Sequence, residues 1–334
     1  MKENWENLLK LTPALLLWYD AHKRALPWRE TVTPYRTWVS EIMLQQTRVS
    51  AVIPYFTRFM DELPTVGALA EVPEERLFKL WEGLGYYSRA RNLHAAAKRV
   101  TEEYGGEFPS DFASLRALPG VGDYTAAAIV SIAFNLPEGA VDGTVMRLLS
   151  RLERCGESIA APAYRKRVRA ALRAMSPTGR CGDFTSALME LGEVVCTPGV
   201  PHCAQCPLSS LCAAHAAGEE ALYPVIPPKK QRRVEERNVL LLLCGDKVAL
   251  RRRPSTGLLA RLWEYPDGPA PAGAEPCGEA IHIFTHVEWH MQGYLCRCAE
   301  ELPGYVWVTA EERAALAIPT AFRVYSAILD KLGH

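Results

Sequence analysis

The chain has 334 residues, of which 49% are hydrophobic and 23% charged, and its 38 basic side chains balance 38 acidic ones. A chain of this length is more typical of two domains than of one, and the composition is that of a globular protein. The formal net charge of zero gives no support to binding a polyanion through overall charge, although the stretch 164–180 is locally basic.

The first twenty residues contain acidic side chains and no cleavable apolar segment, so we expect no signal peptide and a cytoplasmic protein. No run of about 18 apolar residues is present, which excludes a membrane-spanning helix by pattern. Up to about residue 222, apolar residues recur every three to four positions between Gly and Pro residues. This spacing predicts helices at 111–118, 124–134, 144–152 and 184–195.

Four of the ten cysteines lie close together at the end of this helical region. They are Cys196, Cys203, Cys206 and Cys212, with the spacing C-x6-C-x2-C-x5-C. In a cytosolic chain, clustered cysteines favour a metal site over disulfides. On the residues alone, a structural zinc ion held by four thiolates is as good an interpretation as an iron–sulfur cluster.

The pattern changes after residue 222. Residues 223–236 are rich in proline and charge, which predicts a linker. Two apolar runs on either side of Gly245 and Asp246 predict a hairpin, residues 280–298 alternate as strands do, and residues 318–332 return to the helical period. We therefore expect an all-α domain over 1–222, the linker, and a smaller α+β domain over 237–334.

The stretch LPGVGDYTAAAI (118–129) places Gly120 and Gly122 immediately before a helix. Glycine allows close approach of the backbone to a ligand, and the free amides of a helix N-terminus attract phosphate. An ordinary connection between two helices is the alternative on the glycine spacing alone.

The whole string resembles the helix-hairpin-helix element of DNA base-excision glycosylases, whose hairpin amides hold a DNA phosphate. VDGTVMRLLSRL (141–152) resembles the aspartate-bearing segment of that superfamily, and the four cysteines (196–212) resemble its [4Fe–4S] loop. LPWRE (26–30), VSEIMLQQTRV (39–49), GLGYYSRARNL (83–93) and GLLARLWEYP (257–266) resemble the adenine glycosylases of the MutY type. The resemblance covers nearly the whole chain and implies a helical catalytic domain followed by a Nudix-like domain that recognises the lesion.

The resemblance implies a monomeric hydrolase that removes adenine mispaired with 8-oxoguanine or guanine from double-stranded DNA. Glu41 matches the acid that protonates adenine N7, and Asp142 matches the carboxylate that stabilises the cationic sugar. Tyr124 stands where endonuclease III-type enzymes carry the lysine that forms a Schiff base, which implies base removal without strand nicking. By pattern alone, Glu41 belongs to a polar helical stripe that would face solvent.

Other matches concern DNA and the lesion. The resemblance places Gln46 and Tyr86 around the gap left by the flipped nucleotide, Thr47 and Leu84 near 8-oxoguanine, and Arg29 near the extruded adenine. Phe284, Thr285 and His286 stand where the family has Phe-Ser-His to read 8-oxoguanine. The C-terminal region has no Nudix catalytic box, so we expect no pyrophosphatase activity.

Three residues depart from the family pattern. Thr144 replaces the usual asparagine, Ser186 replaces a longer polar residue facing the adenine pocket, and Arg261 replaces a usual glycine. These departures bear on rate and lesion stringency, not on the reaction class. Two alternatives to the monofunctional enzyme remain: a bifunctional glycosylase/lyase, against which Tyr124 argues, and an iron–sulfur DNA-binding protein with weakened catalysis, which Thr144 leaves open. A thymine glycosylase acting on T·G mispairs is a third alternative, against which the C-terminal domain argues.

Overall fold

The computed structural model describes residues 10–228 and 231–334. Residues 1–9 and 229–230, which belong to the predicted helical domain and linker, lie outside this range. The chain forms two compact units: Met1–Ala70 with Ala95–Pro228, and Glu71–His94 with Lys229–His334. The segment 71–94 therefore groups with the C-terminal part of the chain, although the sequence pattern places it in the helical domain.

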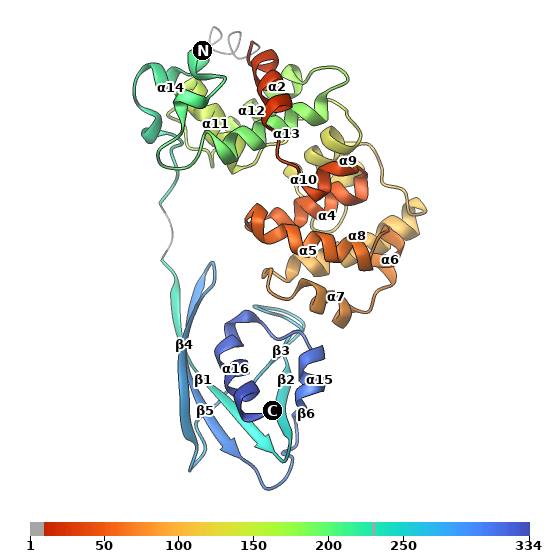
Figure 1. Ribbon diagram of the computed structural model, residues 1–334, viewed down its shortest axis with the longest axis vertical. Coiled ribbons are helices and arrows are strands. Elements are labelled where there is room, and N and C mark those ends of the chain that lie inside the picture. The colour runs from red at the N-terminus through yellow and green to blue at the C-terminus, as the bar shows by residue number, and fades with distance from the viewer. Residues whose placement is uncertain (1–9, 229–230) are drawn as a thin grey trace. The chain divides into compact units, whose positions relative to one another are not determined.

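The first unit is helical (Figure 1). Its α-helices are α2 (Leu11–His22), α3 (Pro27–Glu30), α4 (Pro34–Leu44), α5 (Val49–Glu62), α6 (Val66–Glu71), α9 (Phe112–Arg116), α10 (Asp123–Ala128), α11 (Gly143–Glu153), α12 (Pro162–Met175), α13 (Cys181–Val194), α14 (Ala213–Ala216) and most of α8 (Ser88–Tyr104). A π-helical turn, η1 (Ile129–Ala133), continues α10, and the short turns η2 (Cys203–Gln205), η3 (Ser209–Leu211) and η4 (Glu220–Leu222) follow α13. The four helices predicted from periodicity are thus confirmed.

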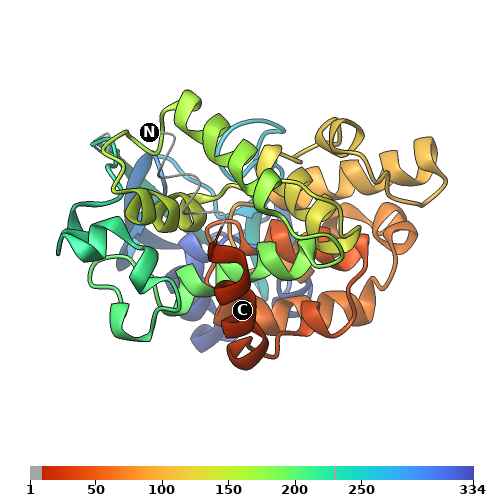
Figure 2. The same cartoon turned by 90° about the horizontal axis from the view of Figure 1, so that it is seen from above.

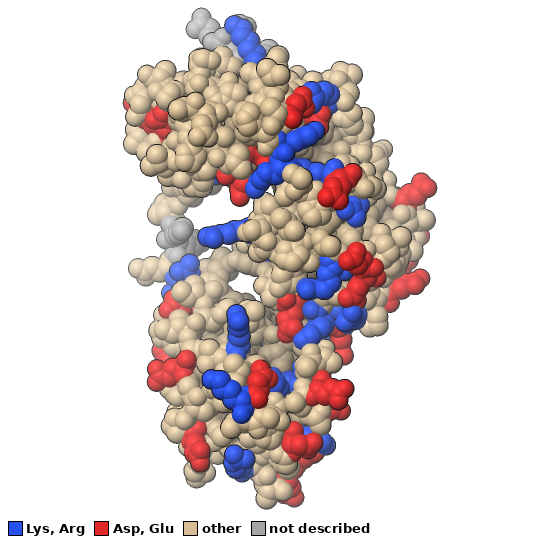
Figure 3. Space-filling model, viewed as in Figure 1, with Lys and Arg blue, Asp and Glu red and all other residues tan. Residues whose placement is uncertain are grey.

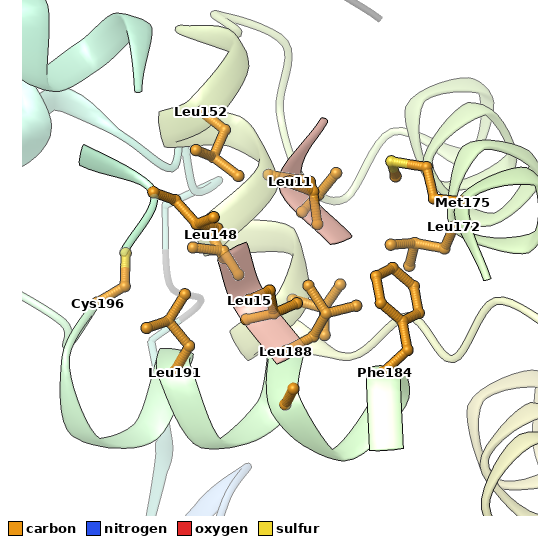
Figure 4. Packing of buried hydrophobic residues seen from close by; sticks show 14 of the residues in the cluster. Leu11, Leu15, Leu148, Leu152, Leu172, Met175, Phe184, Leu188, Leu191 and Cys196 are labelled. Atoms are coloured by element: carbon orange, nitrogen blue, oxygen red, sulfur yellow. The ribbon is translucent and has the colours of Figure 1, made fainter. Parts of the chain in front are cut away.

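One apolar cluster joins α2, α11, α12 and α13 (Figure 4). Leu148 and Leu152 on α11 face Leu188 and Leu191 on α13, because residues three or four apart share one face of a helix. In Figure 2 the red α2 crosses the green α13, and the two helices are in contact. Cys196 lies at the edge of this cluster, so the core fixes the start of the cysteine loop.

The second unit contains a mixed sheet in the order β3-β2-β1-β5-β4, with β6 beside β2. Its strands are β1 (Arg233–Cys244), β2 (Lys247–Arg252), β3 (Trp263–Glu264), β4 (Glu275–Ile283), β5 (Val287–Arg297) and β6 (Val306–Val308). β1 runs parallel to β5 and antiparallel to β2, so the predicted hairpin around Gly245 is confirmed. β1 begins at Arg233, within the stretch predicted as linker.

Helices complete the second unit. They are α7 (Glu74–Trp81), α15 (Ala310–Ala315) and α16 (Arg323–Leu332), with the short turn η5 (Thr320–Phe322) before α16. Tyr325 and Leu329 of α16 are buried against Trp289 and Met291 of β5 and so cover one face of the sheet. Among the described residues, no helix combines the length and apolarity that crossing a bilayer requires.

Candidate active site

A large pocket of about 1280 Å³ lies in the first unit. Side chains from α4, α10, α11 and α13 line it, and Glu41, Tyr124 and Asp142 are among them. The sequence separates these three residues widely, and the packing of the helices brings them to one wall. This pocket is the candidate active site because it gathers ionisable groups in a concave, partly apolar environment.

Glu41 projects from the third turn of α4 and is only 6% exposed. Its neighbour on the same helical stripe, Thr37, is also buried, so the stripe does not face solvent as the pattern alone suggests. Burial raises the pKa of Glu41 to about 7; the hydrogen bond from Tyr124 opposes this shift, and the charge of Asp142 adds to it. A carboxyl group with this pKa can donate a proton near neutral pH.

Tyr124 lies in the first turn of α10 and points at Glu41. Its hydroxyl donates a hydrogen bond of 2.6 Å to Glu41 Oε2 and also lies 3.7 Å from Met189 Sδ. Burial and the nearby carboxyl groups raise the pKa of the Tyr124 phenol well above its ordinary value. The phenol therefore stays neutral and acts as a fixed hydrogen-bond donor.

Asp142 caps the N-terminus of α11. Its Oδ1 accepts a hydrogen bond of 2.6 Å from the amide of Val145, which is the usual N-cap interaction of an aspartate. Burial raises the pKa of Asp142, while the amide of Val145 favours its ionised form. A helix N-terminus also favours a negative charge, so Asp142 is suited to remain an anion beside a buried acid.

Sequence reasoning did not identify a buried acidic group on the same pocket. Glu190 of α13 is 1% exposed and accepts hydrogen bonds from Arg24 Nε at 2.5 Å and from Arg29 Nη2 at 2.8 Å. These two arginines hold the pKa of Glu190 below its ordinary value despite burial. Arg29 also stacks over the ring of Tyr19, which fixes the guanidinium at the pocket wall. The sequence signal for Glu190 would have been a single glutamate in an otherwise mostly apolar stretch of the predicted helix 184–195.

The glycine-containing turn connects α9 to α10. Gly120 has a φ of 73°, a conformation that favours glycine, whereas Gly122 is extended and is the N-cap of α10. A Cβ at Gly122 would meet no atom within 4 Å, so local packing does not explain why glycine stands there. Close approach of a ligand to the backbone remains the interpretation of that residue.

Gln46 and Thr47 lie in the turn between α4 and α5 and line the pocket. Gln46 is exposed and has a φ of 58°, which presents its side chain in a strained backbone conformation. Ser186 on α13 lines the same pocket but is buried. The structure therefore brings Gln46, Thr47 and Ser186 to the pocket that holds Glu41.

The remaining residues that were predicted to contact the lesion lie in the second unit. Leu84 is buried, and Tyr86 is 46% exposed. Phe284, Thr285 and His286 form the turn between β4 and β5, where Phe284 packs edge-on against Trp289 at 4.8 Å while the other two are exposed. The hydroxyl groups of Tyr86 and Thr285 lie 3.2 Å apart, so the structure brings these two predicted sites together.

The four clustered cysteines line a second, small pocket together with Leu148 and Leu152. Arg151 lies beside them, with Nη1 3.3 Å from Cys196 Sγ and 2.8 Å from the carbonyl of Thr197. Within the described range, Cys203, His215 and Glu220 also form a group whose ligand atoms lie within 4.8 Å of one another. The convergence of four thiols on one pocket fits a metal centre with four sulfur ligands.

Comparisons with known proteins decide the family. The chain is 36% identical to an adenine DNA glycosylase of Rattus norvegicus, over 93% of this chain and 77% of that protein. The chain belongs to the adenine DNA glycosylase family. Residues 39–174 match the HhH-GPD superfamily of base excision DNA repair proteins, and residues 238–327 match the NUDIX domain.

Solved structures agree with this family at the level of the helical fold. The chain is similar to a thermostable thymine-DNA glycosylase, with a TM-score of 0.56 and 26% sequence identity; the matched region spans 65% of this chain and 98% of that one. A non-covalent endonuclease III–DNA complex covers 64% of this chain with 97% of its own, at a TM-score of 0.55 and 25% identity. The expected fold, a helix-hairpin-helix glycosylase domain followed by a Nudix-like domain, is confirmed.

Two departures from the adenine DNA glycosylase pattern have a structural counterpart. Thr144 hydrogen-bonds to Asp142, and its methyl group occupies space that a Cβ at Gly192 would need, since the two would be 2.2 Å apart. Arg261 has a φ of 63°, a left-handed conformation that the usual glycine would adopt more easily. Its Nη1 donates a hydrogen bond of 3.0 Å to Glu74 Oε2. Each replacement is therefore accommodated by a partner within the same unit.

Proposed function

We propose that this member of the adenine DNA glycosylase family hydrolyses the N-glycosidic bond of adenine opposite 8-oxoguanine or guanine in duplex DNA, without nicking the strand. The observation that carries the proposal is the hydrogen bond between Tyr124 and the buried Glu41, on the pocket that Asp142 also lines. This arrangement supplies a proton donor and an anion a short distance apart, and it contains a phenol where a lyase would have an amine.

Glu41 supplies the proton. Neutral adenine is a poor leaving group, and protonation at N7 makes it leave more easily. With a pKa of about 7, the Glu41 carboxyl is partly protonated at neutral pH, whereas an ordinary glutamate would be almost fully ionised. Tyr124 fixes the carboxyl by donating to one of its oxygens, which leaves the other oxygen to carry the proton toward the base.

Asp142 stabilises the sugar. Cleavage leaves positive charge on the deoxyribose ring, and a partly buried carboxylate stabilises that charge more strongly than a fully hydrated one would. The hydrogen bond from the amide of Val145 to Oδ1 holds the carboxylate at the pocket wall, where it can face the cation and the attacking water. A phenol at position 124 cannot form an imine with C1′, so the reaction ends with base removal.

Adenine within a duplex must be flipped out before Glu41 can reach it. Gln46 and Tyr86 take the space that the base leaves, since an aromatic ring replaces lost stacking and an amide binds base edges. Thr47, Leu84 and the turn Phe284–Thr285–His286 contact 8-oxoguanine. The exposed positions of Gln46, Tyr86, Thr285 and His286 support these roles.

Double-stranded DNA is the binding partner, and the Gly120–Gly122 turn holds one of its phosphates. The endonuclease III structure that shares this fold is a DNA complex, which supports the assignment. Basic and acidic side chains lie side by side on the face seen in Figure 3, so binding depends on local contacts rather than on overall charge.

Cys196, Cys203, Cys206 and Cys212 hold a [4Fe–4S] cluster. The shared pocket of the four thiols, and the hydrogen bond from Arg151 to Cys196, support this set of ligands. The cluster, when bound, holds the loop in shape and supplies no step of the hydrolysis. Four irons per chain, a brown protein and little zinc are expected by metal analysis; a fully active, zinc-loaded protein would exclude the cluster.

The decisive experiment uses a duplex that carries 8-oxoguanine opposite adenine. Strand breaks are expected only after alkali, and borohydride is expected to trap no covalent complex. Efficient nicking without alkali would favour the bifunctional alternative, and absence of excision together with tight binding would favour the catalytically weakened alternative. Asp142→Asn should lower the single-turnover rate by about 10²–10⁴ while DNA binding is retained.

A further inference from the structure

The loop between α7 and α8 has an unusual backbone. Gly83, Gly85 and Tyr86 all have positive φ angles, of 100°, 69° and 48°. Glycine adopts such angles at little cost, whereas a tyrosine does so only when its surroundings hold it there. Tyr86 is nevertheless 46% exposed, so the packing of its own side chain is not enough to impose this conformation.

Arg89, in the first turn of α8, holds the loop from the inside. It is 7% exposed, and its Nη2 donates to the carbonyls of Leu84 at 3.0 Å and Gly85 at 3.1 Å. The amide of Arg89 donates to the carbonyl of Tyr86 at 2.8 Å. Three consecutive loop carbonyls are therefore bound by one residue, which fixes the backbone that carries the Tyr86 ring.

The guanidinium of Arg89 also contacts two aromatic rings. Its central carbon lies 5.4 Å from the centre of the Trp81 ring and 5.5 Å from that of the Tyr86 ring. Trp81 in turn donates through Nε1 to the carbonyl of Gly85 at 3.1 Å. A planar cation over an aromatic face restrains the orientation of the ring as well as its position.

We propose that Arg89 is a positioning residue that presets Tyr86 as the aromatic wedge for the space left by the flipped adenine. The proposal rests on the proposed function, because it takes insertion of Tyr86 as given. A wedge that is already ordered loses little conformational freedom when it enters DNA, and binding is tighter by that amount. Burial lowers the pKa of Arg89 to about 10, which still leaves the guanidinium charged at neutral pH.

The test compares Arg89→Lys with the wild type. Lysine keeps the charge and can still donate hydrogen bonds, but it has no planar guanidinium to lie over the rings of Trp81 and Tyr86 while binding the carbonyls of Leu84 and Gly85. Affinity is measured for a duplex with 8-oxoguanine opposite a non-cleavable adenine analogue, and 2-aminopurine beside the mispair reports unstacking. We expect a smaller fluorescence increase and about tenfold weaker binding. A tenfold loss of affinity corresponds to the loss of about one cation–π contact and one hydrogen bond.

Epistasis separates positioning from general destabilisation. In a Tyr86→Ala background, Arg89→Lys should change neither affinity nor fluorescence further, because the residue it positions is absent. The matched control is Arg58→Lys, since Arg58 also stacks on a tyrosine, Tyr55, at 4.8 Å but outside this loop, and it should behave as the wild type.

The outcomes are distinct. The proposal would be overturned if the losses of affinity caused by Arg89→Lys and Tyr86→Ala multiplied in the double variant. It would also be overturned if Arg89→Lys bound and unstacked DNA as the wild type does. If both Arg89→Lys and Arg89→Gln failed to fold, as judged by melting temperature, Arg89 would be purely structural and the proposal would also be wrong. Failure of the proposed function is recognised separately, as a wild type that releases no adenine from a cleavable duplex.

Discussion

Removal of one oxygen atom, by Tyr124→Phe, tests the assignment of Glu41 as the acid. The hydroxyl of Tyr124 donates at 2.6 Å to Glu41 Oε2 and favours the ionised carboxyl, and so opposes the effect of burial. A hydrogen bond to a charged group is worth about 1.5–3 kcal/mol, and one pKa unit corresponds to about 1.4 kcal/mol. The variant should therefore raise the pKa of Glu41 by about one to two units above its present value of about 7.

The direction of the pH effect follows from the acid role. The active form of Glu41 is protonated, so activity is present below the pKa and is lost as pH rises through it. The assay is adenine release between pH 5 and 9 at subsaturating enzyme, where the profile reports the free enzyme. The pH at which the rate falls to half should move upward in Tyr124→Phe, even though the maximal rate decreases because the carboxyl is less well positioned.

The matched control removes a different tyrosine hydroxyl. Tyr265 lies in the second unit, with its hydroxyl 2.8 Å from Ser326 Oγ, and Tyr265→Phe should leave the pH profile unchanged. The reasoning would be refuted if the pH at which the rate falls to half on the alkaline side stayed the same in Tyr124→Phe, or moved to lower pH. In either case the falling rate at high pH would belong to another group.

Three further predictions concern stability and metal binding. Because folding raises the pKa of Glu41 from 4.5 to about 7, the folded state loses stability as pH rises through this interval. Glu41→Gln removes this loss, so its free energy of unfolding at pH 8 should exceed that of the wild type by up to about 3 kcal/mol. At pH 5 the difference, measured by urea unfolding, should be much smaller. Cys203→Ser should lower iron content and DNA affinity in metal analysis and binding assays; an unchanged iron content would remove Cys203 from the ligand set. Arg261→Gly relieves a left-handed backbone but loses an exposed ion pair with Glu74, so its free energy of unfolding should change by less than about 1 kcal/mol; a larger loss would mean that the pair matters more than its exposure implies.

Local pattern was sufficient for the elements but not for the site. Helical periodicity predicted α11 and α13, and the turn at Gly245 predicted the β1–β2 hairpin, because these signals lie within a few neighbouring residues. The environment of Glu41 depends instead on distant residues such as Tyr124, which lies 83 residues away on another helix and donates a hydrogen bond to it. The same applies to Glu190, whose partners Arg24 and Arg29 are more than 160 residues distant in sequence. The resemblance to a family predicted the role of Glu41, whereas Glu190 was not predicted at all. In both cases the physical cause became visible only in the packing.

The grouping of residues 71–94 with the C-terminal part of the chain affects the order in which the molecule can form. Glu74 meets Arg261, 187 residues later, and Lys79 meets the carbonyl of Leu316, 237 residues later. At a synthesis rate of about 5–20 residues per second, the first of these contacts waits roughly 10–40 s after Glu74 has been made.

During that interval the segments on both sides of 71–94 can already fold into the helical unit, while 71–94 itself lacks its partners. A fragment that begins at residue 229 would lack one of the two segments of its own unit, and a truncation near residue 225 would leave 71–94 without the other. Point substitutions such as Phe284→Ala and His286→Ala are therefore cleaner tests of the C-terminal unit than its removal.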